Sequence, residues 1–85
     1  MKTITIQVTQ QDIISGKRNS HGQNPLTLAV KRQSHYPAYS TPEVLSKQTS
    51  AGNWIDYTLP SKAQKFLSTF NAGKKVQPAT FTLQS

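Results

Sequence analysis

Lysine and arginine are the residues of this sequence whose types and spacing point most directly to a chemistry. Ten Lys and Arg residues stand against three Asp and Glu residues, which gives a formal net charge of +7. Such an excess favours an anionic partner, although net positive charge also serves solubility alone. Because adjacent cations neutralise neighbouring phosphates, the sequence predicts a nucleic-acid-binding surface. Its candidate residues form three pairs: Lys17, Arg18, Lys31, Arg32, Lys74 and Lys75.

Three aromatic residues form a second group of candidates, for contact with a partner. Tyr36 and Tyr39 follow Lys31 and Arg32 within a segment that has no regular hydrophobic period, and Trp54 is the only tryptophan. Aromatic rings beside cations suit the stacking of single-stranded nucleic acid. They also suit the centre of a protein interface. More often, tyrosines in such a loop fold back and cover a small core, and the sequence favours that interpretation for Tyr36 and Tyr39.

Residue types that support catalysis are scarce. The carboxylates are Asp12, Glu43 and Asp56, and Asp12 has the spacing from Thr9 that a helix-capping box requires. The two histidines are far apart, there is no cysteine, and the four glycines form no phosphate-binding loop. The sequence therefore predicts a protein that is not an enzyme, with no catalytic residues, no metal site and no cofactor.

The stretch from Trp54 to Leu83 contains the strongest structural pattern. A strand is predicted over Trp54–Leu59 and another over Ala79–Leu83, the latter either at an edge of the sheet or pairing late. Between them, apolar residues recur with helical spacing at Ala63, Phe66, Leu67 and Phe70. Pro60 suits the first turn of that helix and Gly73 the left-handed residue just past its end.

The first half of the chain contains weaker versions of the same signals. Residues 3–8 alternate as a half-buried strand, and residues 9–16 read as a short capped helix. Asn24 and Pro25 start a second helix that places Leu26, Ala29 and Val30 on one face. Residues 33–42 read as a loop, and residues 43–49 as a strand that forms a hairpin with Trp54–Leu59.

These elements predict a single α+β domain over residues 1–85, in the order β-α-α-β-β-α-β. The sheet is small and mainly antiparallel, with about four strands and the amphipathic helices on one face. The predicted core consists of Ile4, Ile6, Val8, Leu26, Ala29, Val30, Ile55, Leu59, Phe66, Leu67, Phe70, Phe81 and Leu83.

The order of several motifs resembles a family of small bacteriophage and bacterial proteins. That family's pattern runs V-T-x-x-D-I-x-x-G, then C-P-I-A-L-A-L, then Y-x-L-P-x-x-A-x-x-F-I-x-x-F-D-x-G-x-x-V-x-P-x-x-F-x-L. Its most specific part corresponds to residues 57–83 of this chain. The family's cysteines are absent here, and Asn24 stands where one precedes the proline. The resemblance implies a phage or mobile-element context and an architecture, without catalytic residues.

Two functions follow as hypotheses. In the first, the protein binds nucleic acid through its Lys and Arg residues; in the second, it is a phage effector that inhibits or redirects a host protein, such as a defence component. A homodimer through an exposed strand edge is compatible with either. The chain has no apolar run of the roughly 20 residues that span a bilayer, so a cytoplasmic location in the host cell is expected.

Overall fold

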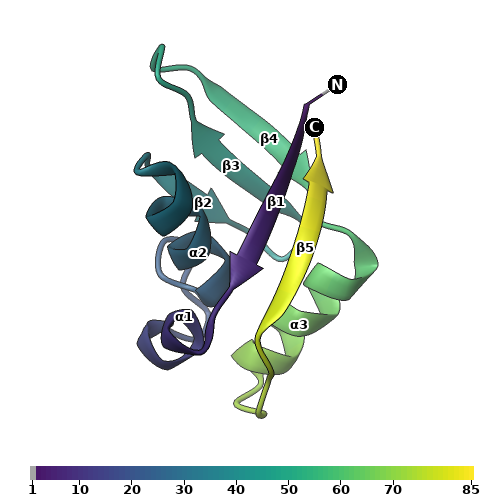
Figure 1. Cartoon of the computed structure of the whole chain (residues 1–85). Helices are drawn as coiled ribbons and strands as arrows, with labels where there is room; N and C mark the ends of the chain where they lie inside the picture. The colour runs from purple at the N-terminus through teal and green to yellow at the C-terminus, as the bar shows by residue number, and fades with distance from the viewer. Residues whose placement is uncertain (1) are drawn as a thin grey trace.

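The chain forms an α+β fold, which is shown by a computed structural model that describes residues 2–85 (Figure 1). Its elements are β1 (Thr3–Val8), α1 (Gln10–Ser15), α2 (Pro25–Ser34), β2 (Ala38–Ser40), β3 (Val44–Gln48), β4 (Trp54–Thr58), α3 (Ser61–Asn71) and β5 (Ala79–Gln84). The strands form one antiparallel sheet in the order β1-β5-β4-β3-β2.

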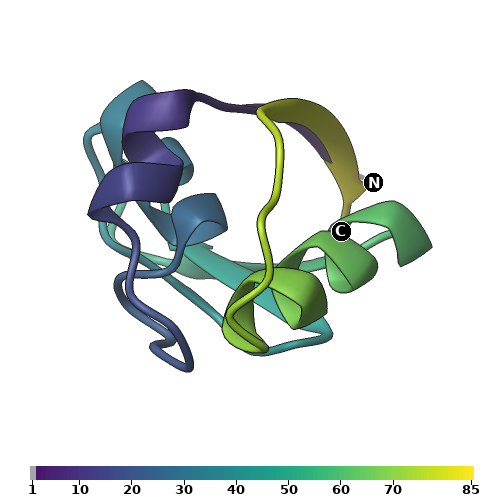
Figure 2. The same ribbon diagram turned by 90° about the horizontal axis from the view of Figure 1, so that it is seen from below.

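The sheet is curled and opens into two blades. β1 and β5 pair along their whole length, and β2, β3 and β4 form a second set of paired strands. The two blades are joined only where Thr58 of β4 pairs with Gln84 of β5. Seen from below, the helices lie between the blades, with α1 and α2 on one side and α3 on the other (Figure 2). Apolar side chains from both blades and the helices thus face a common interior.

The core confirms most of the prediction from hydrophobic spacing. Two predicted members, Ile4 and Ile55, are only partly buried and pack against the edge of the core. Leu45 and Tyr57 add buried side chains from the second blade that the prediction did not include. The fully buried large side chains are Ile6, Leu26, Leu45, Leu59, Leu67, Leu83 and Val8.

Local capping signals are confirmed at both ends of the helices. Thr9 and Asp12 form both halves of a capping box at the start of α1. The Asn24 side chain accepts a hydrogen bond of 2.9 Å from the Thr27 amide, with proline in the first turn of α2. Gly73, just past α3, has a φ of +84°, which an L side chain rarely adopts. Pro60 is the N-cap of α3 rather than part of its first turn.

The prediction of a loop over residues 33–42 was wrong for residues 33–34 and 38–40. α2 continues to Ser34, and Ala38–Ser40 forms β2, so the sheet has five strands instead of about four. β2 shows only one period of alternation, with Tyr39 exposed between buried Ala38 and Ser40, which is too short to recognise in sequence. Its extended form depends on pairing with β3, a tertiary contact.

The predicted edge position of the last strand was also wrong. β5 lies between β1 and β4, and β1 is the strand at that edge. The side chain of Gln33 in α2 covers this edge by accepting from the Gln7 amide at 2.7 Å and donating to the Thr5 carbonyl at 3.2 Å. One side-chain amide therefore provides the two hydrogen bonds that a neighbouring strand would supply.

An ion pair between Asp12 and Arg32 ties α1 and α2 to the same edge. Arg32 Nη2 lies 3.0 Å from Asp12 Oδ2 and also donates to the Gln7 carbonyl at 2.7 Å. The same carboxylate accepts from the Thr9 amide at 2.9 Å. Burial raises the pKa of Asp12, but hydrogen bonds from Arg32 and Thr9 outweigh it, so its pKa lies below the ordinary value of 3.8.

We expect Asp12→Asn to lower the free energy of unfolding by about 2–3 kcal/mol, because it removes charge-assisted hydrogen bonds and leaves Arg32 without its counter-ion. Urea denaturation followed by circular dichroism measures the change. The control is Glu43→Gln, because the exposed Glu43 side chain makes no hydrogen bond or ion pair within residues 2–85, and its expected change is within about 0.5 kcal/mol. Equal losses of unfolding free energy in the two variants would show that the ion pair stabilises the fold no more than an exposed carboxylate does.

The same carboxylate predicts a pH dependence. Because its pKa is lowered in the folded state, its contribution to stability is fully present above the unfolded value of 3.8 and is lost as pH falls through the lower folded pKa. The difference in unfolding free energy between the unmodified protein and Asp12→Asn should therefore be constant near neutral pH and shrink below 3.8. A difference that stays constant into that acid range would contradict this assignment.

Candidate nucleic-acid interface

Three of the predicted phosphate-binding residues come together at the C-terminal end of α3. Arg18, Lys74 and Lys75 line one shallow depression of about 280 Å³, together with apolar groups such as Phe70. The guanidinium of Arg18 lies against Gly73, since a Cβ placed on that glycine would be 3.5 Å from Arg18 Cζ. One basic surface thus combines Arg18 with Gly73–Lys75, which lie at least 55 positions further along the sequence.

The loop that carries Arg18 is fixed to α3 by its backbone. The Asn19 amide donates to Asn71 Oδ1 at 2.8 Å, and the Lys17 amide donates to the Gln23 carbonyl at 2.8 Å. Asn19 has a φ of +56°, a left-handed conformation that asparagine tolerates better than most residues. The loop is therefore held in a defined shape, and Lys17 remains exposed beside Arg18.

Two further lysines extend this basic surface along α3. Lys62 and Lys65 line a second depression of about 300 Å³ that shares Val76 with the first. No carboxylate lines either depression. We use the term basic cluster for the residues Arg18, Lys62, Lys65, Lys74 and Lys75.

Lys62 occupies a position that helix electrostatics disfavours. It lies in the first turn of α3, where the helix dipole is positive, and that turn contains no acidic residue. Helix stability thus gives no reason for a cation at this point. Sequence reasoning missed Lys62 and Lys65 because it considered only adjacent pairs; their i, i+3 spacing on the polar face of the predicted helix was the available signal.

The structure does not bring the third predicted pair into the basic cluster. Arg32 is held by Asp12 and the Gln7 carbonyl, and Lys31 Nζ donates to the Gly22 carbonyl at 2.7 Å. Both lie in the last turn of α2, where cations favour the helix dipole. Their places in the sequence therefore have structural explanations.

The predicted aromatic contact residues separate into a pair and a single residue. The rings of Tyr39 and Trp54 stack across β3, with centroids 5.6 Å apart and an interplanar angle of 29°. They are 52% and 46% exposed, so they do not cover the core. Tyr36 lies apart from them, with Lys47 Nζ 5.7 Å from its ring centroid. We call Tyr39 and Trp54 the aromatic pair.

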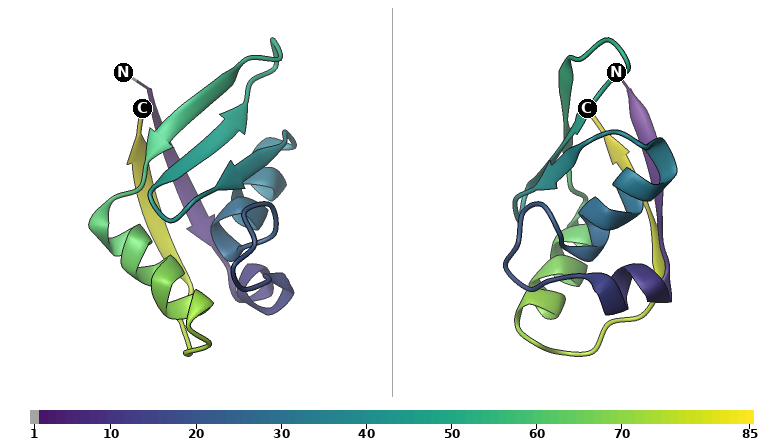
Figure 3. Two further views of the ribbon diagram at one scale, coloured as in Figure 1. Left: turned by 180° about the vertical axis from the view of Figure 1, so that it is seen from behind. Right: turned by 90° about the vertical axis from the view of Figure 1, so that its left-hand side faces the viewer.

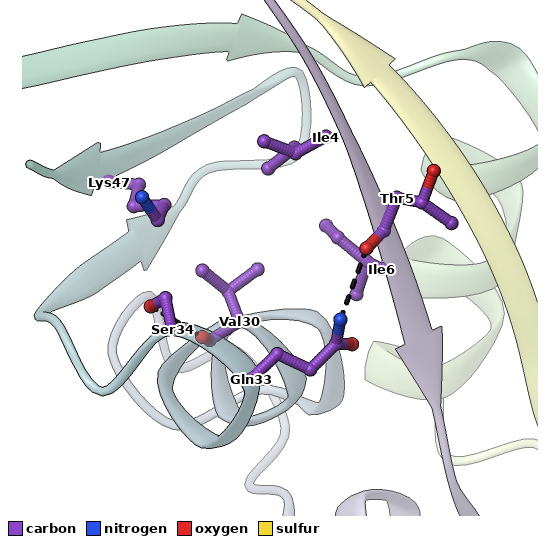
Figure 4. Close-up of a pocket in the computed structure, with 7 residues that line it drawn as sticks. All are labelled: Ile4, Thr5, Ile6, Val30, Gln33, Ser34 and Lys47. Atoms are coloured by element: carbon purple, nitrogen blue, oxygen red, sulfur yellow. Dashed lines mark hydrogen bonds between the residues drawn. The ribbon is translucent and has the colours of Figure 1, made fainter.

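An apolar cavity of about 250 Å³ lies between the blades, beside β1 and α2 (Figure 4). Ile4, Ile6 and Val30 form its apolar walls. Two of the polar side chains at its rim have hydrogen-bond partners, since Gln33 bonds to β1 and Ser34 Oγ donates to the Val30 carbonyl at 2.7 Å. A third, Lys47, has its Nζ 5.7 Å from the ring centroid of Tyr36. The cavity follows from the open sheet and brings together no acid–base or nucleophilic pair.

Two other types of site are absent from the part of the chain that the structure describes. Among residues 2–85, no group of three or more His, Asp or Glu side chains lies close enough to hold a metal ion. No helix in that range has the length and apolar character needed to cross a bilayer.

Comparisons with protein-family models, with curated proteins and with solved structures find no match. The choice between functions therefore depends on the geometry and charge of this chain. The basic cluster brings five cations together from the loop after α1, from α3 and from the segment that follows it.

We expect Lys62→Glu to raise the free energy of unfolding by about 0.3–1 kcal/mol at low ionic strength, because an acid in the first turn complements the helix dipole. Urea denaturation at low and high salt measures the change, which salt should reduce. Lys65→Glu, beyond the first turn of the same helix, is the control and should change stability less. A loss of stability in Lys62→Glu would show that this lysine has a structural role.

Proposed function

We propose that this protein binds nucleic acid through the basic cluster, with Lys17 contributing from the same loop as Arg18. The observation that carries the proposal is the convergence of Arg18, Lys74 and Lys75 from separate parts of the chain onto one surface without a lining carboxylate. Because these cations have no counter-ion at the surface, they are available to replace the condensed cations around a phosphate backbone.

The surface of α3 supports the same proposal. Its exposed residues are Ser61, Lys62, Gln64, Lys65 and Ser68, the C-cap residue Ala72 is also exposed, and none is acidic. Hydroxyl and amide groups donate hydrogen bonds to phosphate oxygens, and lysines add charge without requiring a fixed orientation. The helix and the following loop thus offer both types of contact to a strand along the molecule.

We also propose the biological context that the resemblance to small phage and bacterial proteins implies, namely a phage or mobile element. In that setting, the nucleic acid would be that of the phage or of the host cell. The proposed activity is binding alone, since the basic cluster contains no nucleophile paired with a base.

The test is the affinity for fluorescently labelled oligonucleotides, measured by anisotropy over a range of salt concentrations. We expect log Kd to rise linearly with log salt, with about 0.7–0.9 counter-ions released per phosphate contacted. The double variant Lys74→Glu/Lys75→Glu should lose at least about tenfold in affinity, since it reverses two adjacent charges.

The matched control is Lys2→Glu/Lys47→Glu, which alters two lysines outside the basic cluster. Each Lys→Glu change removes two units of charge, so both double variants lower the net charge of +7 by four. Equal losses in the two variants would show that net charge alone drives binding. Absence of binding at low salt would rule out the proposed function.

A further inference from the structure

One loop connects the basic cluster to the aromatic pair. At its first half, Arg18 lies against Gly73 and the Asn19 amide bonds to Asn71. At its second half, the carbonyl of His21 accepts from the Ser40 amide of β2 at 2.8 Å. Figures 2 and 3 show this loop between the end of α3 and β2. The two surfaces are therefore the ends of a continuous path over the molecule.

The aromatic pair is fixed to the same loop. A Cβ placed on Gly22 would lie 3.5 Å from the ring of Tyr39, so the ring packs directly on the loop backbone. Lys31 Nζ, held by the Gly22 carbonyl, lies 5.9 Å from the centroid of the same ring. Tyr39 and Trp54 thus form a supported, half-exposed platform with a cation at its side.

A polar pocket of about 120 Å³ lies between the two ends of the path, between the loop, β2 and α3. His21, Asn19 and Asn71 are among its lining residues. Asn71 Oδ1 accepts from the Asn19 amide, and the Asn71 amino group donates no hydrogen bond within residues 2–85. The pocket therefore offers hydrogen-bonding groups midway between cations and aromatic rings.

The one carboxylate on the outer face of the sheet also bears on what binds there. Asp56 lies on the same face as Trp54, two residues further along β4, and accepts from Ser46 Oγ at 2.6 Å. A carboxylate repels a phosphate group but accepts hydrogen bonds from the amino groups of bases. The aromatic end of the path thus suits a base, and the α3 end suits phosphates.

We propose that the protein binds single-stranded nucleic acid along this path, with phosphates on Arg18, Lys74 and Lys75 and an unpaired base on the aromatic pair. This inference rests on the proposed function and narrows its ligand to an unpaired strand. Bases in a duplex are stacked on their neighbours and do not reach aromatic side chains, whereas unpaired bases stack readily on exposed rings.

Trp54 provides a direct probe because it is the only tryptophan. The probes are a short oligodeoxycytidylate, the matching oligoribocytidylate, whose bases both carry an amino group for Asp56, a duplex of the same length, and sodium tripolyphosphate as phosphate without bases. We expect both single strands to quench the emission of Trp54, while the duplex and tripolyphosphate leave it unchanged. Comparison of the two single strands distinguishes a DNA ligand from an RNA ligand.

Substitution of the ring that faces the loop separates stacking from charge. Tyr39→Leu should weaken single-strand binding by about tenfold and leave duplex binding within about twofold, as measured by anisotropy. The control is Tyr36→Leu, an exposed tyrosine outside the path, which should change neither. Circular dichroism establishes that each variant is folded, and Trp54→Leu, followed by anisotropy, provides a second test if Tyr39→Leu is not.

The possible outcomes separate this inference from the function on which it rests. Equal affinity for single strand and duplex, with unchanged Trp54 emission, would overturn the inference and leave nucleic-acid binding in place. Quenching by tripolyphosphate alone would also overturn it, because no base would be involved. If no nucleic acid binds, both proposals fail, and the aromatic pair is left as a surface for a protein partner.

Discussion

The ion pair between Asp12 and Arg32 is the interaction on which the arrangement of the other elements depends. It joins the N-terminus of α1 to the C-terminus of α2, and Arg32 also bonds to the backbone of β1. The carboxylate has 6% side-chain exposure, so the pair is partly shielded from water and stronger than a surface ion pair. Once α1 and α2 are fixed in this way, the loop between them has a defined start and end.

The open sheet makes this fixation necessary. A continuous five-stranded sheet would hold its blades together by backbone hydrogen bonds, but β4 and β5 share a single residue pair. The blades are held instead by the apolar core and by side chains, with Gln33 in α2 covering the free edge of β1. The same arrangement leaves outer surfaces, namely the outward face of α3 and the outer face of β2 to β4, free for other contacts.

Seven of the ten Lys and Arg residues form two groups with different surroundings. Lys31 and Arg32 have protein partners and lie where the helix dipole favours them. The basic cluster has no lining carboxylate, and Lys62 lies where the dipole opposes it. Lys74 and Lys75 follow the C-terminus of α3, where the helix dipole favours cations, so Lys62 is the member of the basic cluster whose position helix stability opposes. An external anion explains the position of Lys62 better than stability does, which supports the proposed role in binding.

The sequence by itself determined the elements whose signals are local: the capped helices, the apolar face of α3, the alternating strand β1, and the glycine past the end of α3. These depend on periodicity and on backbone preferences within a few residues. Only the tertiary structure decided that Ala38–Ser40 is a strand, that β5 lies inside the sheet, and that Arg18 meets Lys74 and Lys75 while Arg32 pairs with Asp12. Those features depend on which distant segments come together, and sequence spacing alone does not encode that information.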